Sequence, residues 1–398
     1  MRRPIILLLV LILVVGVAVA IVVVQLQQNK GTTVNGTPVS GTPGPTTPTA
    51  TISVAGIPHA QGSQLVDAAG HPFLLRGAQI ESPFNYIKRW EKGQSPFDEL
   101  NPTVFNAMVH GWHMNALRLP ISNWIWAKYT SDYMSKLDQV VQEANAAGLF
   151  VVFDLHDTVQ SGSPYGTAAT LPKTEDIPFW KAIASRYKDN PMVMFDVFNE
   201  PKYQNWDQWL HGGGTVNGAT VAGTQDLVDA IRSVGARQVI VVEPGSAGKG
   251  VVGVDAAEES GWTTIGNHII NDPNIMYSLH VYDHVADPPQ VQDVKWGPIL
   301  HRYPIYYGEW AFLPNASIPA HCKSIPHDQA PQIMQNFLTY MASRGANWTA
   351  WQFDPGHLIQ NYTTFAPTTL NVPWTCGDTT SGAGMGEIVK QYLTTGQA

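Results

Sequence analysis

The chain has 398 residues, of which 44% are hydrophobic and 14% are charged, and its formal net charge is −8. This composition provides enough apolar side chains for a large core and excludes a chain that is disordered throughout. No basic run alternates with aromatic residues, so we expect no nucleic-acid partner.

The first 24 residues have the pattern of a membrane segment. Arg2 and Arg3 precede residues 5–24, which are uncharged and apolar and are long enough to cross a hydrocarbon core of about 30 Å. Arginines before this stretch and none close after it predict that the N-terminus lies inside the cell and the rest of the chain outside. The stretch is longer than a usual signal sequence, which favours an uncleaved transmembrane anchor. A cleavable signal peptide is the alternative, for which Ala18-Val19-Ala20 offers a cleavage site, and the protein would then be secreted.

Residues 25–54 are rich in Thr, Pro and Gly, and this composition predicts a disordered linker. We expect the remaining residues, 55–398, to form one folded domain. Cys322 and Cys376 are the two cysteines of the chain. In an exported protein two such cysteines often form a disulfide, and two free buried thiols are the alternative.

Eight short apolar runs follow one another from residue 56 onward, as expected for buried strands. They cover residues 73–76, 116–119, 150–154, 193–198, 239–243, 275–280, 305–308 and 349–352. Helix signals separate several of them, at residues 101–111, 131–148, 224–235 and 333–345. This alternation predicts an α/β protein with a closed (β/α)8 TIM barrel, with a doubly wound open sheet as the alternative. We expect residues 62–70 to form a small hairpin at the bottom of the barrel.

Two of the predicted strands end in glutamate. Glu200 follows Asn199 and precedes Pro201, and Glu309 lies between Gly308 and Trp310. The C-terminal ends of barrel strands meet at one face, where barrel enzymes carry their catalytic residues. Cleavage of a glycosidic bond needs at least two carboxyl groups, so two on this face favour a glycoside hydrolase. A single glutamate would more often belong to a structural ion pair.

The other predicted strand ends are also polar or aromatic. Together with the two glutamates they form the set Arg118, His156, Asn199, Glu200, His280, Tyr282, Glu309 and Trp351. This set resembles glycoside hydrolase family 5, the cellulase family, over about residues 56–393. The resemblance implies a TIM barrel and a retaining β-glycoside hydrolase that needs no cofactor.

The resemblance also implies a role for each residue. Glu200 is the general acid and base, and Glu309 is the nucleophile. Asn199 binds the sugar 2-hydroxyl, while Arg118 and Tyr282 keep Glu309 ionised.

The remaining residues of the set bind the sugar on its non-reducing side. His156 and His280 hold this subsite, and Trp351 forms its floor. A further group of tryptophans is expected to line additional subsites or to join the core: Trp124, Trp126, Trp206, Trp209 and Trp262.

The resemblance favours an endo-β-1,4-glucanase that acts as a monomer outside the membrane on a β-linked polysaccharide or oligosaccharide. A β-mannanase or an exo-enzyme acting on β-1,3-glucan is the alternative within the class. A catalytically inactive, sugar-binding surface barrel is the alternative outside it, and the presence of both glutamates argues against it.

The glycine-rich residues 248–253 resemble a dinucleotide fingerprint but follow the fifth strand, so we interpret them as a loop. No motif predicts a catalytic metal.

Overall fold

The computed structural model describes residues 56–80, 98–156, 171–216, 218–244, 261–312, 329–370 and 384–396. The predicted membrane segment 1–24 and linker 25–54 lie outside these residues, as do Cys322 and Cys376, so the anchor, the linker and the disulfide stay predictions. Among the described residues, the structure contains no helix that is long and apolar enough to span a membrane.

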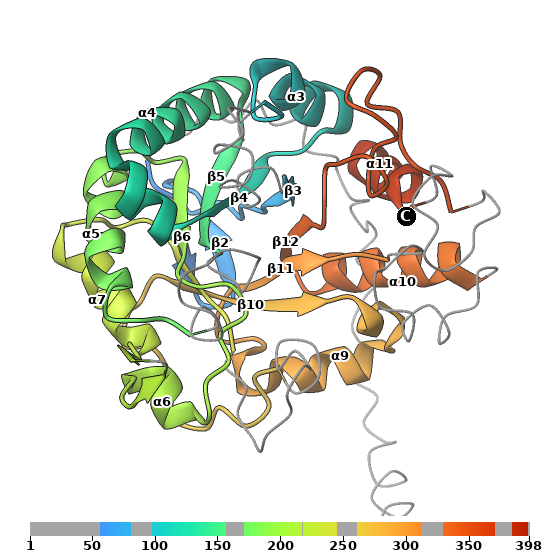
Figure 1. Ribbon diagram of the computed structural model, residues 1–398. Coiled ribbons are helices and arrows are strands. Elements are labelled where there is room, and N and C mark those ends of the chain that lie inside the picture. Colours follow the sequence, from blue (N-terminus) through green and yellow to red (C-terminus); the bar gives the residue numbers. More distant parts are fainter. Residues whose placement is uncertain are drawn as a thin grey trace, which may run out of the picture. The chain divides into compact units, whose positions relative to one another are not determined.

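Eight parallel strands close into a barrel, in the order β10-β11-β12-β3-β4-β5-β6-β9 (Figure 1). Their bounds are β3 (Arg76–Gln79), β4 (Ala116–Ile121), β5 (Phe150–Leu155), β6 (Val193–Asp196), β9 (Ile240–Val242), β10 (Ile275–Val281), β11 (Ile305–Trp310) and β12 (Asn347–Ala350). The closed barrel confirms the predicted fold class and excludes the open sheet. Seven of the predicted strands coincide with observed ones within a few residues, whereas the first begins three residues late, at Arg76.

The helices surround the barrel as an outer ring (Figure 1). They are α3 (Pro102–Asn106), which continues as the π-helical turn η1 (Ala107–Gly111), α4 (Asn123–Ala147), α5 (Asp176–Tyr187), α6 (Trp206–His211), α7 (Thr224–Ser233), α9 (Pro289–Trp296), α10 (Ala330–Ser343) and α11 (Gly386–Thr395). Short 3-10 turns η3 (Asp283–Ala286) and η4 (Gly297–Ile299) flank α9, and a small hairpin of β7 (Thr215–Val216) and β8 (Ala219–Thr220) follows α6.

The helix predicted from residue 131 begins earlier than expected. Its N-cap is Ser122, whose hydroxyl accepts a hydrogen bond from the backbone N–H of Ile125, and not Ser131. Tyr129 has non-helical torsion angles (φ −131°, ψ 35°) and kinks the helix, which explains why the apolar pattern restarts near Ser131. The predicted end at Gly148 is confirmed, since this glycine adopts the left-handed conformation of a C-cap (φ 106°).

A hairpin of β1 (His59–Gln61) and β2 (Gln64–Val66) closes the bottom of the barrel. Leu65 packs into an apolar cluster with Leu75, Ala116 and Phe150, which lie at or just before the N-terminal ends of their strands. The predicted hairpin is therefore present, although it spans residues 59–66, with its turn at Gly62 and Ser63, rather than residues 62–70.

Three of the tryptophans proposed for additional subsites belong to the core. Trp206, Trp209 and Trp262 are 7%, 0% and 0% exposed, and their rings contact one another at centroid distances of 5.5–5.8 Å. The sequence pattern could not separate them from surface tryptophans. Their burial depends on contacts of Trp206 and Trp209, in α6, with Trp262, which is far from them in the sequence. Trp124 and Trp126 are half-buried.

Candidate active site

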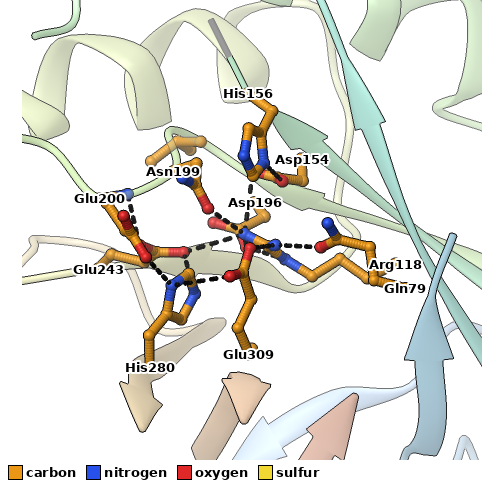
Figure 2. A network of polar contacts seen from close by, with 12 residues as sticks. Gln79, Arg118, Asp154, His156, Asp196, Asn199, Glu200, Glu243, His280 and Glu309 are labelled. Atoms are coloured by element: carbon orange, nitrogen blue, oxygen red, sulfur yellow. Dashed lines mark hydrogen bonds and ion pairs between the residues drawn. The ribbon is translucent and has the colours of Figure 1, made fainter. Parts of the chain in front are cut away.

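Arg118 lies at the centre of a buried charge network at the C-terminal end of the barrel (Figure 2). Its side chain comes from β4, is fully buried, and forms ion pairs with four carboxylates at 2.6–3.1 Å: Asp154, Asp196, Glu243 and Glu309. A guanidinium group carries five N–H donors in a fixed plane, so one arginine can hold several carboxylates at defined positions. Arg118 thereby ties together strands β4, β5, β6 and β11 and the residue that follows β9.

Glu309, in β11, is the carboxylate that is held most closely. Its Oε1 accepts a hydrogen bond from Arg118 Nη1 at 2.6 Å, and its Oε2 accepts a short hydrogen bond from the Tyr282 hydroxyl. His280 Nδ1 lies 3.7 Å from the same Oε2. The side chain is 3% exposed. Donors on both oxygens fix the orientation of the carboxylate and favour its charged form.

Glu200 lies at the top of the fourth barrel strand and is the more accessible of the two glutamates, with 21% of its side chain exposed. Its φ of 46° places its backbone in the left-handed region, which is unusual for a residue with a long side chain. Its Oε1 lies 2.8 Å from His280 Nδ1. An uncommon backbone conformation is often found at functional sites, and here it stands at a predicted catalytic residue.

Asn199 and the aromatic residues flank the pair of glutamates. Asn199 Oδ1 accepts a hydrogen bond from Arg118 Nη2 at 3.0 Å, which leaves its amide N–H2 as the available donor. The half-buried Trp351 ring lies 6.4 Å from the His156 ring and 6.3 Å from the Tyr282 ring. All eight residues predicted from the sequence are therefore brought together at one end of the barrel.

Four polar residues of this network were missed as site residues by the sequence analysis: Gln79, Asp154, Asp196 and Glu243. Glu243 had the clearest signal, because it ends the apolar run 239–243 just as Glu200 and Glu309 end theirs. Asp154 lies two residues before His156 and contacts its Nδ1 at 2.6 Å. Asp196 is three residues before Asn199 and points inward among apolar neighbours of β6.

Burial and neighbouring charges shift the pKa values of the two glutamates in opposite directions. Burial raises the pKa of Glu309, an effect that His280 and Arg118 oppose and the charge of Glu200 reinforces. Burial would also raise the pKa of Glu200, but the hydrogen bond and positive charge of His280 outweigh it and lower this pKa to about 2. The carboxyl groups therefore titrate as a coupled pair together with His280.

Burial and neighbouring charges also shift the pKa values of the other groups in the network. Burial acts to lower the pKa of His280, but Glu243, Glu309 and Glu200 raise it well above the usual value. Asp154 likewise raises the pKa of His156 against the effect of burial. The pKa of Asp196 is raised well above its usual range by burial and by the charge of Glu243.

Two sets of side chains place three possible metal-ligating atoms within 4.8 Å of one another: Asp154, His156 and Glu309, and Glu200, His280 and Glu309. Both sets share Glu309, whose oxygens already accept hydrogen bonds from Arg118 and Tyr282. Their histidines are the same groups whose pKa values are raised, and a protonated imidazole cannot bind a metal. The residues present therefore suit proton transfer better than cation binding.

Comparison with known proteins places this chain in a family. Residues 66–357 match the model of the family described as cellulase (glycosyl hydrolase family 5). The chain is 24% identical over 297 residues to endoglucanase E-5 of Thermobifida fusca, an alignment that covers 73% of this chain and 54% of that protein. It is 26% identical over 360 residues to an endoglucanase of Paenibacillus polymyxa, covering 79% of this chain and 85% of the relative.

Among solved structures, a β-glucanase from Saccharophagus degradans in complex with cellotetraose is similar to this chain, with a TM-score of 0.63. The sequence identity is 22%, and the match covers 86% of this chain and 94% of that one. At this identity the likeness supports the barrel fold and carries no information about the substrate.

Proposed function

Since the chain belongs to glycosyl hydrolase family 5, the cellulase family, and is therefore a glycoside hydrolase, we propose that it is a retaining endo-β-1,4-glucanase. In this proposal Glu200 is the acid and base and Glu309 is the nucleophile. The observation that carries the proposal is the distance between them. A carboxyl oxygen of Glu200 and one of Glu309 lie within 4.8 Å. Retaining enzymes separate these groups by about 5–5.5 Å, whereas inverting enzymes need about 6.5–9.5 Å to admit a water molecule.

In the first step, Glu309 attacks the anomeric carbon while Glu200 delivers a proton to the leaving glycosidic oxygen. The bond between the anomeric carbon and this oxygen breaks, and an ester forms between the sugar and the Glu309 carboxylate. Arg118 and Tyr282 orient Glu309 for the attack. The amide N–H2 of Asn199 donates to the sugar 2-hydroxyl, an interaction that strengthens as positive charge develops on the ring.

In the second step, Glu200 takes a proton from a water molecule, which attacks the anomeric carbon from the side that the leaving group vacated. The ester bond breaks, and Glu309 returns to its charged form with the configuration of the sugar retained. The greater exposure of Glu200 supports this division of roles, because the acid and base must meet both the leaving group and water.

The substrate is proposed from the relatives, whose names are those of endoglucanases. Trp351 and His156 are proposed to bind the sugar next to the cleaved bond, with the Trp351 ring stacking on its C–H face. His280 was expected in the same subsite, but it is fully buried and both of its ring nitrogens face carboxylates, so it contacts Glu200 and not the sugar. Measuring the products formed from β-1,4-glucan, mannan, β-1,3-glucan and xylan tests the proposal. We expect internal cleavage of β-1,4-glucan into oligosaccharides of mixed length. Preferred cleavage of mannan, or release of single sugars from β-1,3-glucan, would favour the alternative activities, and absence of any hydrolysis would favour a sugar-binding barrel.

We further propose that residues 1–24 anchor the enzyme in the cell membrane and that residues 25–54 tether the barrel outside the cell. The support is the sequence pattern of these residues, with two arginines before an uncharged apolar stretch.

A further inference from the structure

We propose that Glu243 is a positioning residue that retains one proton on the Glu200–His280 pair, and that this pair rather than Glu200 alone is the acid of the reaction. The inference rests on the proposed function, in which Glu200 protonates the leaving oxygen.

The first support is that one carboxylate contacts both members of the pair. Glu243 Oε2 accepts a hydrogen bond from the backbone N–H of Glu200 at 2.7 Å, and Glu243 Oε1 lies 2.9 Å from His280 Nε2. Arg118 Nη2 donates to the same Oε1 at 3.1 Å and anchors the carboxylate from the other side (Figure 2). Glu243 is fully buried, so these are strong contacts that water does not screen. It therefore fixes both the left-handed backbone of Glu200 and the plane of the imidazole.

The second support is the balance of charge around His280. Glu200, at the end of β6, and Glu243, after β9, lie 2.8 and 2.9 Å from its two nitrogens. Glu309, in β11, lies 3.7 Å from Nδ1. The other titratable or charged groups of this network are the carboxyl groups of Asp154, in β5, and Asp196, in β6, the imidazole of His156, and the guanidinium group of Arg118, in β4. Carboxylates thus face both ring nitrogens, and their negative charge favours the charged imidazolium form of His280.

The third support is the space made for the ring by Gly308. A Cβ atom at this position would lie 3.0 Å from His280 Nε2 and 2.7 Å from the Ser278 hydroxyl oxygen. Any other residue before Glu309 would crowd the His280 ring and the Ser278 hydroxyl group. The lack of a side chain at Gly308, next to the nucleophile, therefore leaves room for the His280 ring.

Sharing a proton with His280 lets the pair act as an acid at neutral pH, although His280 lowers the pKa of Glu200. At rest the proton resides on His280 Nδ1, 2.8 Å from Glu200 Oε1. As the glycosidic bond breaks, this proton passes to Glu200 and the carboxyl group gives a proton to the leaving oxygen. His280 is left neutral, with Nε2 still 2.9 Å from Glu243 Oε1. In the second step, a proton from water passes to Glu200 and returns to Nδ1, so the cycle closes.

The test is the pH dependence of kcat/KM in Glu243→Gln, measured with a β-1,4-linked oligosaccharide. The alkaline limb of the profile reports loss of the shared proton. Because the introduced amide carries no charge to stabilise the imidazolium, we expect this limb to move to lower pH by about one unit or more. A rate that falls equally at every pH, with the alkaline limb unmoved, would mean that Glu243 is only structural and would overturn the proposal.

Asp196→Asn is the matched control, because Asp196 is also buried and also contacts Arg118, with no hydrogen bond to either member of the pair among the described residues. The substitution leaves both contacts of Glu243 with the pair in place. We expect the alkaline limb of this variant to stay near that of the parent enzyme. A shift equal to that of Glu243→Gln would overturn the specific role of Glu243.

A second measurement uses the unaltered protein and does not depend on the variant folding. Imidazole 15N chemical shifts of His280 should show both nitrogens protonated at pH 7, and a neutral ring there would overturn the proposal. If the parent enzyme hydrolyses no β-glycoside, the proposed function fails and this inference with it. If the parent is active and His280 is neutral, or the limb does not move, the inference alone fails.

Discussion

Among single residues, Arg118 is the positive charge that holds the nucleophile Glu309 and the neighbouring carboxylates in place. Its side chain is fully buried and pairs with four of them. Removing one partner of a buried ion pair leaves uncompensated charge and typically costs about 3–5 kcal/mol. We therefore expect Arg118→Ala to lower the free energy of unfolding by at least this amount in urea denaturation.

Arg186→Ala provides the control for this prediction. Arg186 pairs with Asp138 between α5 and α4, but its side chain is 45% exposed, and an exposed pair contributes about 0–1 kcal/mol. Equal losses of stability in the two variants would show that the Arg118 network contributes no more than a surface pair.

The pKa of Glu309 gives a prediction for the acid side of the pH profile. A nucleophile must be ionised, so activity falls as the pH drops through its pKa. Because burial raises this pKa above the usual value for glutamate, we expect the acid limb of kcat/KM to lie at a higher pH than about 4.3. A profile that stays flat below that pH would contradict either the raised pKa or the role of Glu309.

At the scale of elements, the packing of β3 against β4 depends on Gly77. A Cβ atom at this position would lie 1.9 Å from the backbone oxygen of Ala116, and a backbone atom cannot move aside as a flexible side chain can. Gly77→Ala should therefore separate the two strands and markedly lower the melting temperature. Gly111→Ala is the control, since Gly111 has no atom within 4 Å of the added Cβ. We expect its melting temperature to be unchanged or higher, and equal losses in both variants would refute the argument.

Strands were easier to predict than helix starts, for a physical reason. A buried parallel strand needs apolar side chains on both faces, so runs such as 150–154 and 193–198 stand out in the sequence. A helix start depends on one cap, and both Ser122 and Ser131 are suitable residues. The kink at Tyr129 explains why the apolar pattern favoured Ser131 over Ser122 as the cap.

The site was predictable where residue type indicates chemistry, as for Glu200 and Glu309. Glu243 was not recognised, because its importance comes from contacts with His280 and the backbone of Glu200, which are far from it in the sequence. The opposite pKa shifts of the two glutamates also depend on burial and distance, and no sequence pattern contains these.

At the scale of the whole molecule, the barrel should function without the N-terminal residues. Every residue of the described site lies between Gln79 and Trp351, so a chain of residues 55–398 should keep kcat on a soluble oligosaccharide. We expect the full chain to sediment with membranes and the shortened chain to stay in the supernatant. A full chain found in the supernatant with its first residues removed would instead support the signal peptide.

If Glu309 is the nucleophile, it forms a covalent ester with the sugar, and trapping this ester is the decisive experiment. A 2-deoxy-2-fluoro glycoside with a good leaving group slows the second step more than the first, so the intermediate should accumulate. Mass spectrometry of the digested enzyme should then find one added sugar on the peptide that contains Glu309, and none on this peptide in Glu309→Ala. A sugar attached to another residue, or inactivation without any covalent label, would contradict the account.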